Sequence, residues 1–313
     1  MPCMPTLSTC STFTNGIWFA AAPCAPVAER VRRRAFLVAL AFAVGLVPLA
    51  TQAAGIASLN LCSDLLVLML ADRNDIASVT WLAADPADSP LAAQAQGLPV
   101  NHGSAEEILM FDPEVIVAAR YARGETVAML RRLGRRVVML DPADSLEGIR
   151  RNLRIVGEAV GHPERAETAI AAMDRRLDAL AGQAKDRPPL LVAVYMARGF
   201  TVGAPSVVND LLGLLNLRNL GAEPGLAGGT VLPVETLLIA DPDVLVVTSY
   251  GTDAPSLATA VVDHPALEKL RAERPVITVP TQLWDCGTPL VVEAAERIAA
   301  GLEAGGQAGR SVE

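Results

Sequence analysis

The sequence has few of the residues that perform catalysis or bind metals. It contains only three histidines in 313 residues, His102, His162 and His264, and they lie far apart in the chain. HExxH and CxxC motifs are absent, as are a GxGxxG fingerprint after a strand and a phosphate-binding loop ending in GK[ST]. We therefore predict no metal site and no cofactor, and we expect that the protein is not an enzyme.

The first 53 residues have the pattern of an export signal. Arginines between positions 30 and 34 precede an uncharged apolar run over 35–50, and small residues near Ala53 suit a cleavage site. The string RRAFL at 33–37 also resembles a twin-arginine export motif. The apolar run is short for a membrane span, although an N-terminal membrane anchor is the alternative. We predict that residues 1–53 are a signal peptide and that the mature protein is periplasmic.

Loss of this segment leaves an acidic chain with two cysteines. Four arginines and one glutamate are removed, which takes the net charge from −8 to −11 and argues against nucleic acid as a partner. Only Cys62 and Cys286 remain, and an even number of cysteines in an exported protein favours a disulfide. Such a bond also requires the two Cα atoms to lie close together in the fold.

One stretch of sequence occurs twice. GSAEEILMFDPEVIVAAR at 103–120 returns as VLPVETLLIADPDVLVVT at 231–248, and both Glu106 with Glu235 and Pro113 with Pro242 are separated by about 129 residues. Each copy predicts a helix, a turn at Asp-Pro and then a run of β-branched residues without polar alternation. Such a run is typical of a parallel strand covered on both faces. The repeat therefore predicts an α/β fold with two Rossmann-like lobes, each with a parallel-type sheet, and a cleft between them.

Strand and helix patterns divide the rest of the chain. In an N-terminal lobe over 54–155 we expect strands at 55–61, 76–81, 115–119 and 136–140. The helical periodicity of Pro163–Ala184 then predicts a connector helix within 156–185, the alternative being a surface helix inside one domain. A C-terminal lobe over 186–302 follows, with strands expected at 190–196, 244–248 and 276–279. Residues 303–313 are predicted to be a disordered tail.

Aromatic residues are scarce, at 4% of the chain, so their placement is informative. Every Trp and Tyr after residue 53 lies at or just beyond the carboxyl end of a predicted strand: Trp81, Tyr121, Tyr195, Tyr250 and Trp284. Ligands bind at this edge in doubly wound sheets, so we predict an aromatic ligand cleft, with rings that merely fill loop gaps as the alternative. In such loops a guanidinium pairs with carboxylates or stacks on conjugated rings. We therefore add Arg120 and Arg198 as ligand-binding candidates, together with Asn60 after the first strand.

These features together resemble the periplasmic solute-binding proteins of ABC importers for ferric siderophores, haem and cobalamin. The resemblance runs from IASLNLCSD at 56–64 through both repeats to VITVPTQLWDCGTP at 276–289. Members of that family have two α/β lobes joined by one long helix. The resemblance implies a monomeric, non-catalytic receptor that captures a metal chelate, either cobalamin or a ferric siderophore, and delivers it to an ABC permease and its ATPase. The alternatives are a haem receptor of the same type, a chelatase-like α/β enzyme and a sensory module.

The resemblance also implies roles for particular residues. In the family, a glutamate on each lobe meets arginines of the permease, and the matching positions here are Glu106 and Glu235. Each glutamate also opens a helix, and Ser104 with Glu107 forms a capping-box pattern, so a purely structural role is the alternative. A bond between Cys62 and Cys286 would cross the cleft and restrict its opening.

Overall fold

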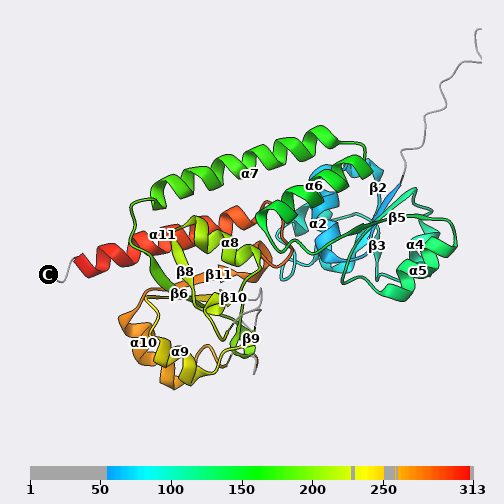
Figure 1. Cartoon of the computed structure of the whole chain (residues 1–313). Helices are drawn as coiled ribbons and strands as arrows, with labels where there is room; N and C mark the ends of the chain where they lie inside the picture. Colours follow the sequence, from blue (N-terminus) through cyan, green and yellow to red (C-terminus); the bar gives the residue numbers. More distant parts are fainter. Residues whose placement is uncertain (1–54, 227–229, 250–257, 259, 311–313) are drawn as a thin grey trace, which may run out of the picture. The chain divides into compact units, whose positions relative to one another are not determined.

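The structure is a computed structural model that describes residues 55–226, 230–249, 258 and 260–310 (Figure 1). These residues belong to one compact unit, 52–313. The predicted signal peptide lies outside the described residues. Within the described part of the chain, no helix combines the length and the apolar character that a bilayer span requires.

The first lobe is built on a five-stranded parallel sheet of order β3-β2-β1-β4-β5. Its strands are β1 Ile56–Ser58, β2 Ile76–Thr80, β3 Val100–Asn101, β4 Val115–Ala119 and β5 Arg136–Leu140. Helices α2 Leu61–Leu70, α3 Ala92–Ala95, α4 Ala105–Met110 and α5 Gly124–Arg132 connect them. The four strands expected in this lobe are confirmed. The strand β3 was missed because two residues carry no readable periodicity.

The central strand β4 shows why an uninterrupted apolar run was needed. Val115 and Val117 pack into a core shared with α2, whereas Ile116 and Ala118 pack on the other face against α4 and α5. Successive side chains of a strand point to opposite faces, so a strand covered on both sides has no position for a polar residue. All five residues of β4 are accordingly buried.

The second lobe repeats this plan with a four-stranded parallel sheet of order β11-β10-β6-β8. Its strands are β6 Leu190–Tyr195, β8 Leu217–Asn219, β10 Val244–Ser249 and β11 Val276–Pro280, and its helices are α8 Val207–Leu214, α9 Val234–Ala240, α10 Glu268–Glu273 and α11 Val291–Arg310. The three expected strands are confirmed, and β8 was missed. A short antiparallel pair, β7 Phe200–Thr201 with β9 Thr230–Val231, adds a feature that the sequence did not indicate.

The repeated Asp-Pro turns have the same backbone conformation. Asp112 and Asp241 adopt left-handed φ angles of 46° and 42°. The ring of the following proline disfavours the helical region for the preceding residue, so each helix ends there. Each aspartate also pairs with an arginine that lies just before a neighbouring strand, Asp112 with Arg135 before β5 at 2.6 Å and Asp241 with Arg274 before β11 at 3.1 Å. The duplication predicted from the sequence is thus present in the fold.

Two consecutive helices join the lobes. Helix α7 covers Pro163–Ala184, as its periodicity predicts, but residues 156–159 of the expected connector belong to α6, Leu146–Ala159. A turn at Gly161, with a φ of 82°, separates the two helices. One apolar core cluster includes Ile56 of the first sheet, Met173 of α7 and Val192 of the second sheet. The lobes are therefore continuous through their apolar interior.

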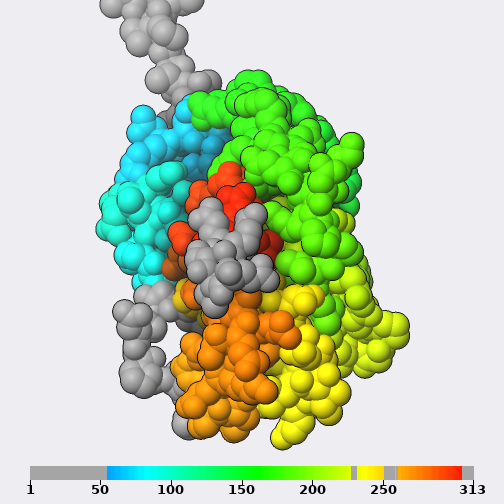
Figure 2. Space-filling view, turned by 90° about the vertical axis from the view of Figure 1, so that its left-hand side faces the viewer, coloured from blue at the N-terminus to red at the C-terminus, as the bar shows by residue number. Residues whose placement is uncertain are grey.

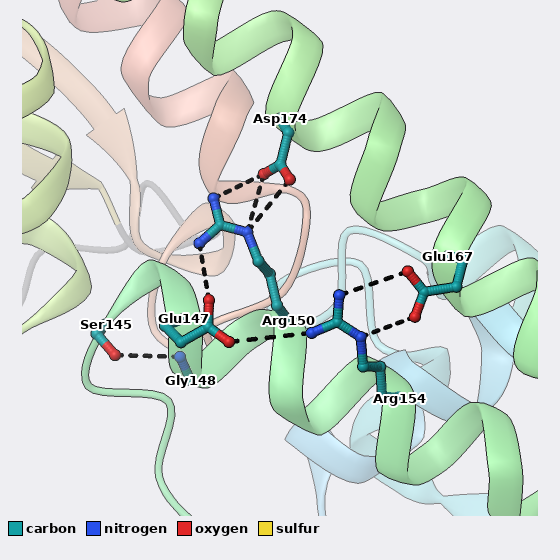
Figure 3. Close-up of polar contacts among 7 residues, drawn as sticks. All are labelled: Ser145, Glu147, Gly148, Arg150, Arg154, Glu167 and Asp174. Carbon is teal, nitrogen blue, oxygen red and sulfur yellow. Dashed lines mark hydrogen bonds and ion pairs between the residues drawn. The ribbon is translucent and has the colours of Figure 1, made fainter.

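Ion pairs reinforce this packing (Figure 3). Arg150 of α6 pairs with Asp174 of α7 at 2.8 Å, and Arg154 pairs with Glu167 at 2.7 Å. On the other side of α7, Arg176 pairs at 2.7 Å with a glutamate of α11, Glu296. Both lobes are consequently tied to the connector by charge as well as by apolar contact.

The C-terminal helix α11 packs against both α7 and β11. Figure 1 draws it alongside α7, and Figure 2 shows its red residues beside green ones on one face of the molecule. It continues to Arg310, so the prediction of a disordered tail is wrong for residues 303–310, and residues 311–313 lie outside the description. The glycine-rich composition of residues 303–313 suggested a disordered C-terminus. Alanine has the highest helix propensity, and the alanines of the preceding turns pack in the core together with Leu302. The helix therefore continues into the glycine-rich segment.

Candidate functional site

A pocket of about 410 Å³ lies where the strand ends of the two lobes meet. The first lobe contributes α2 and the residues that follow β4 and β5, including Leu66, Arg120, Tyr121, Asp141 and Asp144. The second lobe contributes residues that follow β6 and β11, including Met196, Phe200, Val202, Trp284 and Asp285. Ligands of parallel α/β sheets bind outside the carboxyl ends of the strands, so this position suits a binding site.

Two of the predicted aromatic residues line this pocket. Tyr121 follows β4 and is 82% exposed, whereas Trp284 follows β11 and is 4% exposed. Phe200, 44% exposed, joins them from β7. The pocket thus has an accessible ring from each lobe and a buried indole in its wall. Their role in binding a ligand stays a prediction.

The other predicted aromatic residues lie elsewhere. Tyr195 is fully buried in a core cluster with Ala193 and Leu232, because it shares the strand face that α9 and α10 cover. Trp81 begins a 3-10 turn, Trp81–Ala84, and is half exposed without lining the pocket. The expectation that both face the cleft is therefore wrong. Tyr250 lies outside the described residues.

Of the three polar residues predicted to bind the ligand, one lines the pocket and two do not. Arg120 lines the pocket. Arg198 does not: its backbone adopts a φ of 61°, its N–H donates to the carbonyl of Ala258, and its side chain is exposed. Asn60 is occupied structurally, since its Oδ1 accepts from the backbone N–H of Ala119 at 3.2 Å and from the Ser63 hydroxyl at 2.6 Å. It caps α2 rather than facing the pocket.

The predicted disulfide is present, and it joins the lobes beside the pocket. Cys62 of α2 and Cys286 after β11 have their Cα atoms 4.9 Å apart, and both residues line the cavity. Gln282 Nε2 adds hydrogen bonds from the second lobe to the carbonyls of Pro86 at 3.0 Å and Ala87 at 2.5 Å. The two walls of the pocket are therefore fixed to one another on this side.

The pocket contains acidic side chains that the sequence reasoning missed. Asp285 has no hydrogen-bonding or ionic side-chain partner among the described residues, and neither do Asp141 and Asp144. Asp285 is exposed by its solvent-accessible area, but the pocket walls beside it partly desolvate the carboxylate and raise its pKa to about 6. The string DPAD at 141–144, directly after the strand expected at 136–140, was the available signal in the sequence.

A second aspartate with a raised pKa lies away from the pocket. Asp64 of α2 is fully buried between β1 and β2 and accepts hydrogen bonds from the Ser58 hydroxyl and from the backbone N–H and hydroxyl of Thr80. Burial raises its pKa to about 6 although these hydrogen bonds oppose the change. This carboxylate orders the strand ends of the first lobe.

Among the described residues, Asp72, Asp75 and His162 form one group with ligand atoms close enough to share a cation. Ion pairs account for two members of this group, Asp72 and His162. Asp72 lies 2.6 Å from Arg165 and 3.2 Å from His162, and the Arg165 guanidinium lowers the pKa of Asp72. The group joins α2 to the start of α7, and it is remote from the pocket lining.

The glutamates of the two repeats lie on the surface. Glu106 is in the first turn of α4 and Glu235 is in the first turn of α9, and both are exposed without an ion pair to any described residue. One helical turn further along, Met110 is 75% exposed and Ile239 is 85% exposed. Residues four apart share a helix face, so each copy presents an acid beside a bare apolar side chain.

Comparison with known proteins places this geometry in context. A family model described as "Periplasmic binding protein" matches residues 56–281. A cobalamin-binding protein of Halobacterium salinarum is 24% identical over 237 residues, which is 74% of this chain. The chain spans 64% of the length of that relative.

Solved structures resemble the whole two-lobed fold. The periplasmic heme-binding protein of Roseiflexus sp. RS-1, in its apo form, has a TM-score of 0.65 and 22% identity, covering 79% of this chain and 96% of its own. The periplasmic vitamin B12-binding protein of Vibrio cholerae has a TM-score of 0.62 and 19% identity, covering 81% and 98%. An ABC-type Fe³⁺-hydroxamate transport protein of Saccharomonospora viridis has a TM-score of 0.61 and 19% identity, covering 80% and 93%. These likenesses establish the fold.

Proposed function

Because the chain belongs to the family of periplasmic binding proteins, we propose that it captures a metal chelate between its lobes and delivers it to the permease of an ABC importer. The pocket between the two sets of strand ends is the observation that supports this proposal most directly. Its walls are largely apolar, with a few polar groups, as small-molecule sites usually are. We further propose that residues 1–53 are removed on export to the periplasm.

Candidate cargoes follow from the relatives. Proteins with this fold include binders of vitamin B12, heme and Fe³⁺-hydroxamates, and the relative from Halobacterium salinarum is a cobalamin-binding protein. Each of these cargoes is a metal held in an organic shell, so the protein need not supply metal ligands itself. A receptor function of this kind also agrees with the pocket lining, which contains no histidine within the part of the chain that the structure describes.

Tryptophan fluorescence tests the capture step. Trp284 lies in the pocket wall and Trp81 lies outside it, and these are the two tryptophans of the mature chain. We expect saturable quenching by at least one of cyanocobalamin, a ferric trihydroxamate and haemin. Trp284→Phe should lose most of the signal change, whereas Trp81→Phe, the matched control, should keep it. The proposal fails if none of the three chelates changes the fluorescence or binds by calorimetry.

Docking to the permease is proposed to use the faces that carry Glu106 with Met110 and Glu235 with Ile239. Exposed charges chiefly set the orientation and the rate of association, and exposed apolar side chains add buried area. We expect Glu106→Ala or Glu235→Ala to slow uptake by cells about five-fold, roughly 1 kcal/mol, without changing chelate affinity. Glu125→Ala, an exposed acid of α5, is the control. Unchanged uptake in both variants would remove the docking assignment and leave the capture step intact.

A further inference from the structure

The charges around the pocket are unequal. Three carboxylates, Asp141, Asp144 and Asp285, line it together with a single guanidinium, that of Arg120. Among the described residues none of the four side chains has an ion-pair partner, so these charged groups are free to interact with a ligand. The cavity therefore has an excess of negative charge over walls that are mostly apolar.

The apolar part of the lining accepts the flat or rounded body of a chelate. Leu66, Leu140, Met196, Phe200 and Trp284 supply aliphatic and aromatic surface from both lobes. Contact with such surface stabilises a bound organic shell through area removed from water. Apolar contact alone does not distinguish one chelate from another, so selection depends on the polar groups at the edge of the ligand.

Asp285 lines the pocket between the buried Trp284 and the disulfide-bonded Cys286. An ionised carboxylate accepts hydrogen bonds and donates none, and its charge is poorly screened inside a partly enclosed cavity. An anionic ligand placed there would repel Asp285, and Arg120 could neutralise only one of its charges. A ligand with N–H donors at its rim would satisfy the carboxylate.

Resting on the proposed function, we infer that the pocket selects chelates without net negative charge whose rims carry N–H donors, with Asp285 as the acceptor that determines this specificity. Amide-rimmed corrinoids and ferric trihydroxamates both have this chemistry. Haem, with two propionates, and tris-catecholate iron complexes, with net negative charge, do not.

Equilibrium binding of three probes to the purified mature protein tests this inference. Cyanocobalamin and a neutral ferric trihydroxamate represent the two sources of the favoured chemistry, and haemin represents the anionic class. At pH 7.5 we expect one of the first two to bind at least ten-fold more tightly than haemin. Asp285→Asn should weaken binding of that neutral ligand about ten-fold, because its N–H donors then meet a neutral acceptor in place of a charged one, and it should tighten binding of haemin.

The pH dependence adds a second readout. The other titratable groups that face Asp285 across the pocket are Tyr121, Asp141, Asp144 and Arg120. Lowering the pH from 7.5 to 5 should protonate Asp285 and reduce the preference for the neutral ligand over haemin. The Asp285→Asn variant should show a much smaller change. Asp178→Asn, which removes one exposed charge from α7, is the matched control and should behave as the wild type.

The outcomes separate the two proposals. Binding of haemin as tight as that of the neutral chelates, or an unchanged ratio in Asp285→Asn, would overturn the charge selection while the receptor function stands. Absence of binding by all three probes would overturn the receptor function itself. Circular dichroism and thermal unfolding of each variant confirm that a loss of affinity does not come from a loss of fold.

Discussion

The two copies of the repeat have the same turn but start their helices differently. Asp112 and Asp241 share a left-handed φ angle and an arginine partner. At the helix start, Ser104 accepts a hydrogen bond from the Glu107 N–H at 3.2 Å, whereas Pro233, the equivalent residue, has no side-chain acceptor. The turn sets the direction in which the chain enters the buried strand, so its conformation is the same in both copies. A helix can begin with a side-chain cap or with a proline, so its start can differ.

The lobes also differ in what they bury. The first lobe encloses the carboxylate of Asp64 between its strands, and the second lobe encloses the phenol ring of Tyr195 in an apolar cluster. The folded state of the first lobe is therefore expected to respond to pH in the acid range. The predictions below test whether the lobes, despite these differences, behave as one cooperative unit.

The largest effect is expected from the bond that joins the lobes. Cys62 and Cys286 are 224 residues apart in the sequence, and closing so long a loop stabilises the fold by about 5 kcal/mol in the chain-entropy description, often less in practice. The Cys62→Ser/Cys286→Ser double variant should lose up to this amount in urea unfolding. Two separate transitions in the variant, in place of one in the oxidised protein, would show that the lobes unfold independently. A reductant should destabilise the wild type and leave the double variant unchanged.

An effect on the order of 3 kcal/mol is expected from Asp64, within the first lobe alone. Its pKa is raised from 3.8 to about 6, so the folded state binds more protons than the unfolded state between these pH values. The stability from this group is fully present below about pH 3.8 and is lost as the pH rises through about 6. Relative to the wild type, Asp64→Asn should therefore gain stability between pH 4 and pH 7.

Urea unfolding at several pH values measures this difference. The comparison of variant with wild type cancels the carboxylates whose pKa is lowered, such as Asp72 and Glu107, which change stability in the opposite direction. Asp178→Asn should show no such trend. Parallel pH profiles for Asp64→Asn and the wild type would contradict the assignment.

The smallest effect concerns the helix starts. Ser104→Ala removes the cap of α4 and should cost about 1 kcal/mol. Pro233→Ala removes no hydrogen bond at the equivalent position and should change stability by only about 0.5 kcal/mol, through the greater freedom of the unfolded chain. Equal losses in thermal unfolding would mean that Ser104 contributes little as a cap.

Much of the fold could be predicted because its signals are local. The apolar runs at 115–119 and 244–248 lie within β4 and β10, and Pro163 marks the first residue of α7. The short strands β3 and β8 could not be predicted, since their pairing depends on neighbours distant in the sequence.

The site was harder to predict, because a position at a strand end does not fix the direction of a side chain. Tyr121 and Tyr195 both occur at the carboxyl end of a predicted strand, yet Tyr121 lines the pocket and Tyr195 points into the core. A shift of one residue along a strand exchanges its two faces. The pairing of Cys62 with Cys286 was predictable from their number, whereas the fold determines that Asp285 lines the same pocket as Asp141 and Asp144.

The middle of α7 holds both lobes at nearly the same point. Asp174 pairs with α6 of the first lobe, and Arg176, two residues on, pairs with α11 of the second. A rotation of one lobe against the other would have to separate one of these pairs or bend the helix between its two anchors. Under the proposed function, the permease would have to supply the force that separates the lobes to release a chelate. Because the pairs are partly exposed, the resistance to this separation should fall as ionic strength rises.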